Sequence, residues 1–156
     1  MEKIRSKSTE ITLSPASLWD LAAIRSIERV TFPQDAWPLL EMVGVLTFAS
    51  MERWKAEDGE RLVAFVAADI RKSQNIAWIA TISVDPEYQR QGLGNRLMEK
   101  VEGLVGVKSM RLSARKSNKA AIQLYQRRGY EQIDVWPEYY SGREDALVME
   151  KNLLVE

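Results

Sequence analysis

The segment with the clearest chemical potential is a polar turn at residues 89–94, Gln-Arg-Gln-Gly-Leu-Gly, which separates an apolar run from an amphipathic helical pattern. The apolar run, residues 78–84, stops at Pro86, and Leu93 begins the helical pattern. The first N–H groups of a helix have no internal partner and carry about half a positive charge, so they attract anions. Glycine lets the backbone approach a phosphate closely, and Arg90 can add a charge-assisted contact. The turn therefore predicts a site for an anionic ligand.

The composition limits the chemistry that such a site can perform. The 156 residues include no cysteine and no histidine. This excludes disulfides, thiolate or histidine metal sites, a cysteine nucleophile and a Ser-His-Asp triad; we expect no metal, and any general base must be a carboxylate, a tyrosine, a lysine or a water. The 22 basic and 22 acidic residues balance, which disfavours nucleic acid as a partner. No stretch approaches the length of a membrane span and residues 1–7 lack the apolar core of a signal peptide, so we expect no membrane partner and a cytoplasmic location.

The elements that must position the turn follow from apolar periodicity and from glycine and proline punctuation. Residues 1–156 are expected to form one domain, with residues 1–10 frayed or leading into the first strand. Ser14 and Pro15 predict a helix start, Asn118 predicts a helix cap and Gly129 a helix end. We expect strands at 11–13, 62–70, 76–84, 109–114, 130–136 and 146–153, and helices at 15–30, 39 to about 51, 92 to between 103 and 106, and 118–128. Elements in this order predict an α/β fold with one mixed, mostly antiparallel sheet of about six to seven strands and helices on both faces.

A second motif strengthens the first. Residues 115–125 carry Asn118, Ala121 and Tyr125 ahead of Gly129 and Tyr130. With residues 84–94, this motif resembles the two signatures of the GNAT superfamily of acetyl-CoA-dependent N-acetyltransferases, in the order and approximate separation that the family requires. The resemblance covers nearly the whole chain from residue 11. It implies the single-domain GNAT fold with a splayed central strand pair, and acetyl-CoA as cosubstrate without a metal.

A narrower resemblance involves the C-terminal part of the chain. Residues 137–149, Pro-Glu-Tyr-Tyr-Ser-Gly-Arg-Glu-Asp-Ala-Leu-Val-Met, are similar to the tail of the protein N-terminal α-amine acetyltransferases. That group includes the bacterial RimI enzymes, which modify a ribosomal protein. Phe32 and Pro33 also fit the group. The resemblance implies that Tyr139 and Tyr140, with Phe32 and Pro33, line the groove for the first residues of the substrate, although loop aromatic residues can equally pack on a neighbouring helix.

The GNAT resemblance also implies the cofactor site. Backbone N–H groups of the polar turn would hold the cofactor pyrophosphate, and the backbone of two residues before it would bond to the pantetheine arm as an added strand. The residues implied in cofactor binding are Ile82, Val84, Gln89, Arg90, Gln91, Gly92, Leu93, Gly94, Asn95, Asn118 and Tyr125. Asn118 would bond the cofactor arm or cap its helix, and these two roles are compatible. A basic cluster is expected to form a solvated face and to lend one or two residues to the cofactor 3′-phosphate: Lys108, Arg111, Arg115, Lys116 and Lys119.

The catalytic residues that the resemblance implies are Tyr125 and Ser113. Tyr125 would be the general acid, since a tyrosine of pKa near ~10 can stabilise a thiolate by hydrogen bonding even when proton transfer is incomplete. The alternative for Tyr125 is an ordinary core aromatic residue. Ser113 stands where RimI-like enzymes carry a glutamate; serine is a poor base, but it can hold a water. Asp35 and Glu28 are further carboxylate candidates for the base, although solvated surface charge is the favoured interpretation of both.

The missing glutamate bears on the acceptor. An α-amine has a pKa near ~8, so deprotonating it at neutral pH costs about 1 kcal/mol, whereas a lysine amine near ~10.4 costs roughly 4 to 5 kcal/mol. A site without a strong base therefore suits α-amines better. We predict direct acetyl transfer to a primary amine in a ternary complex, with a protein or peptide N-terminus, a ribosomal protein included, as favoured acceptor. A small amine such as a polyamine, amino acid or aminoglycoside is the alternative acceptor, and a non-catalytic acyl-CoA-binding regulatory module is the alternative class. The sequence is compatible with either a monomer or a homodimer.

Overall fold

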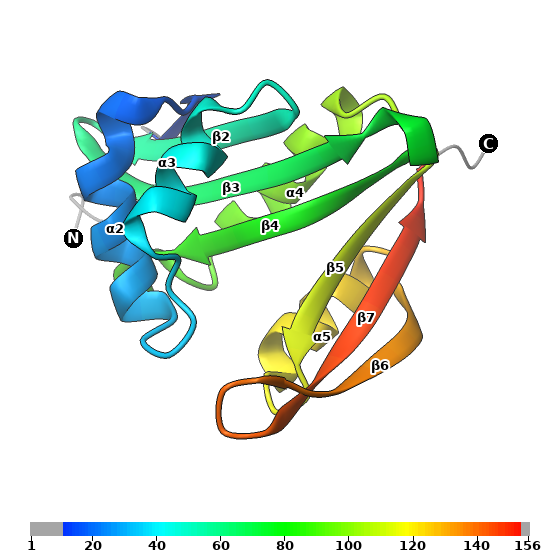
Figure 1. Cartoon of the computed structure of the whole chain (residues 1–156). Coiled ribbons are helices and arrows are strands. Elements are labelled where there is room, and N and C mark those ends of the chain that lie inside the picture. Colours follow the sequence, from blue (N-terminus) through cyan, green and yellow to red (C-terminus); the bar gives the residue numbers. More distant parts are fainter. Residues whose placement is uncertain (1–10, 154–156) are drawn as a thin grey trace.

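Within residues 11–153, seven strands form one sheet in the order β1-β2-β3-β4-β5-β7-β6 (Figure 1). The computed structural model describes residues 11–153, so the expectation for residues 1–10 lies outside the described residues. The strands are β1 Ile11–Pro15, β2 Met51–Asp58, β3 Arg61–Arg71, β4 Ile76–Val84, β5 Ser109–Arg115, β6 Glu131–Tyr140 and β7 Glu144–Asn152. The helices are α2 Leu21–Thr31, α3 Leu39–Thr47, α4 Leu93–Leu104 and α5 Lys119–Arg127, with short 3-10 turns η1 Leu18–Asp20, η2 Lys72–Gln74 and η3 Pro86–Tyr88.

The strand β2 was not predicted. Its sequence, Met-Glu-Arg-Trp-Lys-Ala-Glu-Asp, is rich in good helix formers, so local propensity favours a helix. Antiparallel pairing with both β1 and β3 overrides that preference. The helix expected to reach residue 51 accordingly ends at Thr47, and the next residue, Phe48, is already extended. The prediction of a helix through Met51 was therefore wrong.

Two other boundaries differ from expectation. Pro15 does not open a helix, because it pairs with Trp54 at the end of β1; helix α2 begins only at Leu21. Strand β6 continues past residue 136 to Tyr140, so the expected loop at 137–142 is partly strand. The register between β6 and β7 shifts between Trp136 and Tyr140, which lets the strand bend without ending. Tyr139 and Tyr140 thus sit on a strand and not on a loop.

The centre of the sheet splays open. Strands β4 and β5 are the parallel pair, and they are hydrogen-bonded only where Ile76, Ala77 and Trp78 face residues 109–111. Beyond Trp78 the two strands diverge in a V, which Figure 1 shows between the green β4 and the yellow-green β5. The other neighbouring strands are antiparallel. The expected mixed sheet with a splayed central pair is confirmed.

Helices cover both faces of the sheet because β3 is apolar on both sides. Phe65 and Ala67 pack with α2 and α3 in one core cluster, whereas Ala64, Val66 and Ala68 pack with α4 and α5 in the other. This alternation follows the two-residue period of a strand. Within residues 11–153 no helix is long and apolar enough to cross a membrane.

Candidate active site

The polar turn after β4 has the backbone of an anion site. Arg90 and Gly92 both adopt the left-handed conformation, with φ of 63° and 81°. Gly92 is the N-cap of α4, no side chain caps this end, and the N–H of Arg96 donates to the Gly92 carbonyl at 3.0 Å. The N–H groups of the first turn therefore remain available to a ligand. Alternating left-handed positions in such a turn form a concave set of N–H donors that suits a phosphate.

A cleft of about 780 Å³, here called the donor cleft, lies against this turn. The predicted cofactor residues line it, with Gln91 as the exception because its amide turns back toward the Glu87 carbonyl, 3.5 Å away. The cations at its wall are Arg90 and Arg127, and Arg127 was not anticipated. The donor-cleft lining from the predicted set is Ile82, Val84, Gln89, Arg90, Gly92, Leu93, Gly94, Asn95, Asn118 and Tyr125.

A second cleft of about 370 Å³, the acceptor cleft, occupies the splay between β4 and β5. The α2–α3 loop, β4, β5, the start of α5 and the end of β6 all contribute to its lining. Phe32, Ser113, Tyr139 and Tyr140 line it as expected, but Pro33 lines neither cleft and is exposed to solvent. Residues that sequence analysis did not anticipate here are Trp37, Pro38, Ile79, Ala80, Thr81, Leu112 and Ala114.

The two clefts meet at Tyr125. Four other residues also line both clefts and so surround Tyr125 where the clefts meet: Phe32, Ile82, Asn118 and Ala121. Tyr125 is only 7% exposed and belongs to the core cluster, yet it also lines both clefts. Its place in the core is therefore compatible with a role in the site. Its hydroxyl makes no hydrogen bond with another described residue. Burial, with a smaller contribution from Tyr140, raises the pKa of Tyr125 well above its ordinary value, so the hydroxyl is a proton donor at neutral pH.

Asn118 is a helix cap. Its side-chain oxygen accepts a hydrogen bond from the Ala121 N–H at 3.3 Å at the start of α5. Gly129, with φ of 98°, ends the same helix, and the Tyr130 N–H donates back to the Tyr125 carbonyl at 3.0 Å. Both capping predictions are confirmed, and the two caps fix the helix that presents Tyr125.

Ser113 and Tyr140 are joined across the acceptor cleft. The Ser113 Oγ and the Tyr140 hydroxyl lie 2.9 Å apart, and burial raises the pKa of Tyr140 despite that hydrogen bond. The Tyr140 ring contacts Tyr139 edge-on at 5.0 Å, and Tyr139 contacts Trp136 at 5.0 Å. The aromatic residues of β6 therefore pack on one another, Trp136 also stacks on Trp78 of β4, and Tyr139 leaves 58% of its surface exposed at the cleft mouth.

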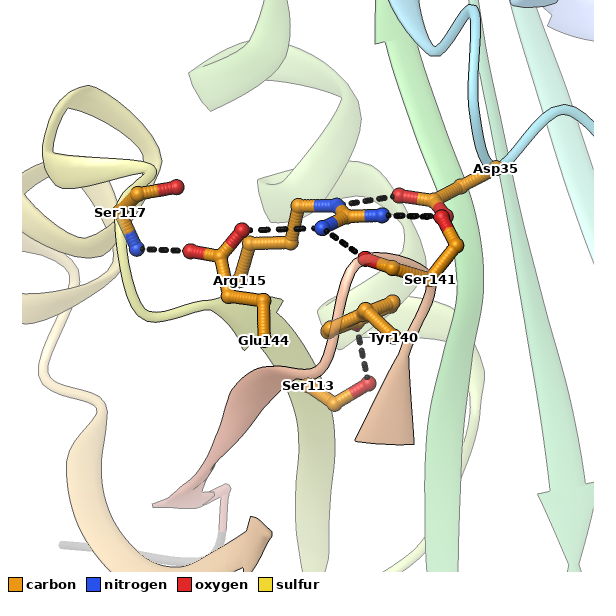
Figure 2. Close-up of polar contacts among 7 residues, drawn as sticks. All are labelled: Asp35, Ser113, Arg115, Ser117, Tyr140, Ser141 and Glu144. Atoms are coloured by element: carbon orange, nitrogen blue, oxygen red, sulfur yellow. Dashed lines mark hydrogen bonds and ion pairs between the residues drawn. The ribbon is translucent and has the colours of Figure 1, made fainter. Parts of the chain in front are cut away.

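Arg115 ties together the segments around the acceptor cleft (Figure 2). Its Nε and Nη2 donate to the two carboxylate oxygens of Asp35 at 2.6 and 2.8 Å, and Nη1 donates to Glu144 at 2.9 Å. The same guanidinium reaches the Ser141 carbonyl and hydroxyl and lies over the Tyr140 ring. Figure 2 shows Asp35 arriving from the α2–α3 loop, so this ion pair spans the two halves of the molecule.

This network corrects two expectations. Asp35 is not a solvated surface charge, because its carboxylate is held by the fork of Arg115. Of the five basic residues, Lys108, Lys116 and Lys119 are exposed to solvent as expected, whereas Arg115 lines the acceptor cleft and Arg111 pairs with Glu150 at 2.7 Å. None of the five lines the donor cleft, so the part expected to reach the cofactor 3′-phosphate finds no support. The pairing partners are distant in sequence, which is why spacing alone suggested a cluster.

Glu28 also departs from expectation. Its side chain is buried between α2 and β4 with only 1% of its surface exposed, so solvated surface charge was wrong. Its Oε2 accepts a hydrogen bond from the Thr81 hydroxyl at 2.7 Å. Burial raises the pKa of Glu28 above the ordinary value, opposed first by the hydrogen bond from Thr81 and then by the polar groups of Ser83 and the Trp37 backbone, which lie near it without a hydrogen bond of normal geometry. The polar residues Thr81 and Ser83 in an otherwise apolar run were the signal in the sequence that such a partner exists.

Comparison with known proteins decides the family. The sequence profile of the acetyltransferase (GNAT) family matches residues 21–130. The chain belongs to the GNAT acetyltransferase family. It is 34% identical over 149 residues to the [ribosomal protein bS18]-alanine N-acetyltransferase of Escherichia coli K12, covering 88% of this chain and 95% of that protein. It is 39% identical over 89 residues to the N-alpha-acetyltransferase 20 of Dictyostelium discoideum, covering 53% of this chain and 51% of that one.

Solved GNAT structures have the same fold. The crystal structure of the E. coli ribosomal-protein-S18-alanine N-acetyltransferase superposes with a TM-score of 0.85 at 28% identity, covering 94% of this chain and 96% of that one. Arabidopsis thaliana NAA60, solved in complex with acetyl-CoA, superposes with a TM-score of 0.80 at 22% identity, covering 91% and 98%. The sheet and its splay are therefore those of a GNAT acetyltransferase, which uses acetyl-CoA as donor.

Proposed function

We propose that the protein acetylates the N-terminal α-amine of a protein or peptide by direct transfer from acetyl-CoA in a ternary complex. The observation that carries this proposal is the meeting of two clefts at one buried tyrosine. The donor cleft starts at the phosphate-type turn, the acceptor cleft fills the strand splay, and Tyr125 forms a wall of both. Two substrates held this way can react without a covalent enzyme intermediate, since their reacting groups meet at the shared wall.

The donor cleft fits acetyl-CoA. The uncapped start of α4 and the left-handed Arg90 and Gly92 suit the pyrophosphate. The edge of β4 that β5 leaves unpaired beyond Trp78, where Ile82 and Val84 lie, suits the amide-bearing arm, although the Gln89 side chain, which donates to the Val84 carbonyl at 3.0 Å, would have to give way there. Arg90 and Arg127 supply positive charge at the wall. Acetyl-CoA supplies the acetyl group as a thioester, which an amine attacks at the carbonyl carbon with release of the CoA thiolate.

The chain contributes a proton donor and a positioned acceptor groove. The buried Tyr125 hydroxyl, with its raised pKa and no protein partner, is free to donate to the leaving thiolate. Backbone N–H groups of the splayed β4 stabilise the developing oxyanion. The aromatic walls of the acceptor cleft, Phe32, Tyr139 and Tyr140, surround the first residue of the incoming chain.

Three considerations favour an α-amine acceptor. The acceptor cleft, at about 370 Å³, holds the end of a chain and not a broad surface. Among the described residues, Asp35 is the carboxylate that lines the cleft, and it is already paired with Arg115, so no carboxylate in the cleft wall can deprotonate a strongly basic amine directly and the less basic amine is the easier one to use. The E. coli relative acts on the alanine of ribosomal protein bS18. We therefore propose an N-terminus as acceptor, with a ribosomal-protein N-terminus, which this enzyme would meet in the cytoplasm, as the first candidate.

An acetyl-transfer screen tests the proposal. Thiol release from acetyl-CoA would be followed with an alanine-initiated peptide, the same peptide with a blocked N-terminus and an internal lysine, a polyamine and an aminoglycoside. We expect turnover with the free N-terminus and loss of turnover when it is blocked. Turnover confined to a small amine would assign the enzyme to small-molecule acetylation. Acetyl-CoA binding without release of free thiol in the presence of any of these amines would make the chain a non-catalytic acyl-CoA-binding module.

A further inference from the structure

A buried polar group lies between α2 and β4, beside both clefts. Glu28 is 1% exposed and Ser83 is 1% exposed, and each has one oxygen, Oε1 and Oγ respectively, without a hydrogen-bond partner of normal geometry among the described residues. The other Glu28 oxygen is bonded by Thr81 at 2.7 Å. Buried polar atoms in folded proteins are almost always satisfied, so an orphaned carboxylate oxygen indicates a bound water or a proton-transfer role.

Within residues 11–153 no cation compensates this carboxylate. On the same side of the sheet, α2 packs with helix α3 and strand β3 in an apolar core cluster that includes Met42 and Phe65. Arg25 and Arg29 of α2 form no ion pair with Glu28. Strand β4 brings only the two hydroxyls and the α2–α3 loop brings the Trp37 backbone, and no charged side chain of residues 11–153 contributes to its pKa. The titratable side chains of the neighbouring acceptor cleft are Asp35, Arg115, Tyr125, Tyr139 and Tyr140. A carboxylate desolvated in this way is a stronger base than one in water.

The group is connected to the place of reaction. Thr81, which hydrogen-bonds Glu28, lines the acceptor cleft. Thr31, one turn along α2 from Glu28, lines the donor cleft, and its hydroxyl is also buried without a partner. A hydroxyl can accept a proton on one side and donate one on the other, so Thr81 can connect an amine in the acceptor cleft with the Glu28 carboxylate.

We propose that Glu28, acting through the Thr81 hydroxyl, is the proton acceptor for the amine in the reaction proposed above. The α-ammonium passes one proton to the Thr81 oxygen as the Thr81 proton moves to Glu28. The neutral amine then forms the new C–N bond while the C–S bond breaks. Its second proton replaces the one that Tyr125 gives to the thiolate, and Glu28 returns its proton to solvent after product release. Glu28 does not touch the substrate and is a positioning residue, whereas Thr81 contacts the amine.

The pH dependence of kcat/KM separates this relay from a structural role. With Glu28 in place, the enzyme uses the ammonium form, and the rate reaches its plateau below the pKa of the amine. In Glu28→Gln the amine must arrive neutral, so kcat/KM should follow the amine titration and fall about 30-fold between about pH 9.5 and 6.5 for an amine of pKa near ~8. The difference in kcat/KM between Glu28→Gln and the original enzyme should nearly vanish at about pH 9.5. An acceptor with a weakly basic amine, already neutral at pH 7, should be used equally well by both enzymes.

Three variants complete the experiment. Thr81→Val should give the same shifted pH profile of kcat/KM as Glu28→Gln, although Glu28 is intact. Thr81→Ser should restore the pH profile of the original enzyme. Asp35→Asn should reach its kcat/KM plateau at the same pH as the original enzyme. The Tm of Glu28→Gln minus that of the original protein should grow as pH rises through the raised pKa of Glu28, since only the original protein must then bury a charge. Parallel pH profiles for the original protein and Glu28→Gln would overturn the relay while leaving α-amine acetylation standing. Absence of α-amine turnover in the original protein would instead overturn the proposed function.

Discussion

Replacing Tyr125 by phenylalanine tests the shared wall of the two clefts with little structural disturbance. The ring is 7% exposed and contacts Tyr130 edge-on at 5.9 Å, and phenylalanine keeps that packing. The lost hydroxyl makes no hydrogen bond with a described residue, so its removal orphans no partner there. We expect the free energy of unfolding to change by no more than about 0.5 kcal/mol.

Turnover should respond much more strongly. If the hydroxyl donates to the leaving thiolate, Tyr125→Phe removes one hydrogen bond to a charged group, worth about 1.5 to 3 kcal/mol. This corresponds to a fall in kcat of about 10- to 150-fold, because each 1.36 kcal/mol of barrier is tenfold in rate. Acetyl-CoA affinity should stay the same, since the thioester in the ground state carries no such charge. Thiol release measures kcat, and calorimetry on acetyl-CoA measures binding.

Tyr130 supplies a matched control in the same core. Its hydroxyl donates to Glu102 at 2.9 Å, and the residue is 2% exposed. Tyr130→Phe should therefore cost about 1.5 to 3 kcal/mol of stability, or about 3 to 12 °C in Tm, with kcat unchanged. Equal kcat for Tyr125→Phe and the original enzyme would refute the assignment of Tyr125 as acid. A fall in kcat accompanied by a fall in Tm as large as that of Tyr130→Phe would show that Tyr125 acts through packing.

Three further changes test other parts of the site. Gly92→Val should weaken acetyl-CoA binding about tenfold by calorimetry, because a φ of 81° strains a β-branched residue by about 1 to 2 kcal/mol although no atom blocks its Cβ. Gly103→Ala, on the exposed side of α4, is the control, and unchanged affinity in Gly92→Val would contradict the pyrophosphate site. Arg115→Lys keeps the charge but loses the fork to Asp35, so KM for the peptide should rise several-fold with acetyl-CoA affinity intact; a change confined to acetyl-CoA would contradict its place in the acceptor cleft. Burial alone would raise the pKa of Glu102, but hydrogen bonds from Arg128, Lys151 and Tyr130 lower it, so its stabilisation is full above its usual value of 4.5 and is lost as pH falls through the lower folded pKa. The stability difference between the original protein and Glu102→Gln should therefore shrink on acidification in urea titrations, and a constant difference would count against that ion network.

The parts of the fold that the sequence predicts are those with local physical signals. The left-handed Gly92 before α4, the Asn118 cap and the Gly129 stop each depend on a few neighbouring residues. The hairpin of β3 and β4 follows from two apolar runs with a polar turn between them. These signals fix the donor side of the site, because the cofactor turn and the helix bearing Tyr125 are both local units.

The acceptor side depends on contacts between distant residues. Asp35 and Arg115 pair across 80 positions, and Glu28 meets Thr81 across 53. A single sequence does not say which distant residues pair, so both carboxylates were misjudged as surface charge even though Thr81 and Ser83 marked a polar spot within the apolar run of β4. Strand β2 was missed for the same reason, since only its neighbours β1 and β3 make it a strand. Packing between distant residues, and not local propensity, shapes the acceptor cleft.

Under the proposed function, the common wall at Tyr125 predicts that the two substrates compete for volume. An acyl group longer than acetyl would extend from the end of the donor cleft into the 370 Å³ that the first residue of the acceptor would occupy. We therefore expect acyl-chain length and the size of the first acceptor residue to be coupled through one space. A small first residue should leave room for a propionyl group, whereas a large one should restrict the enzyme to acetyl.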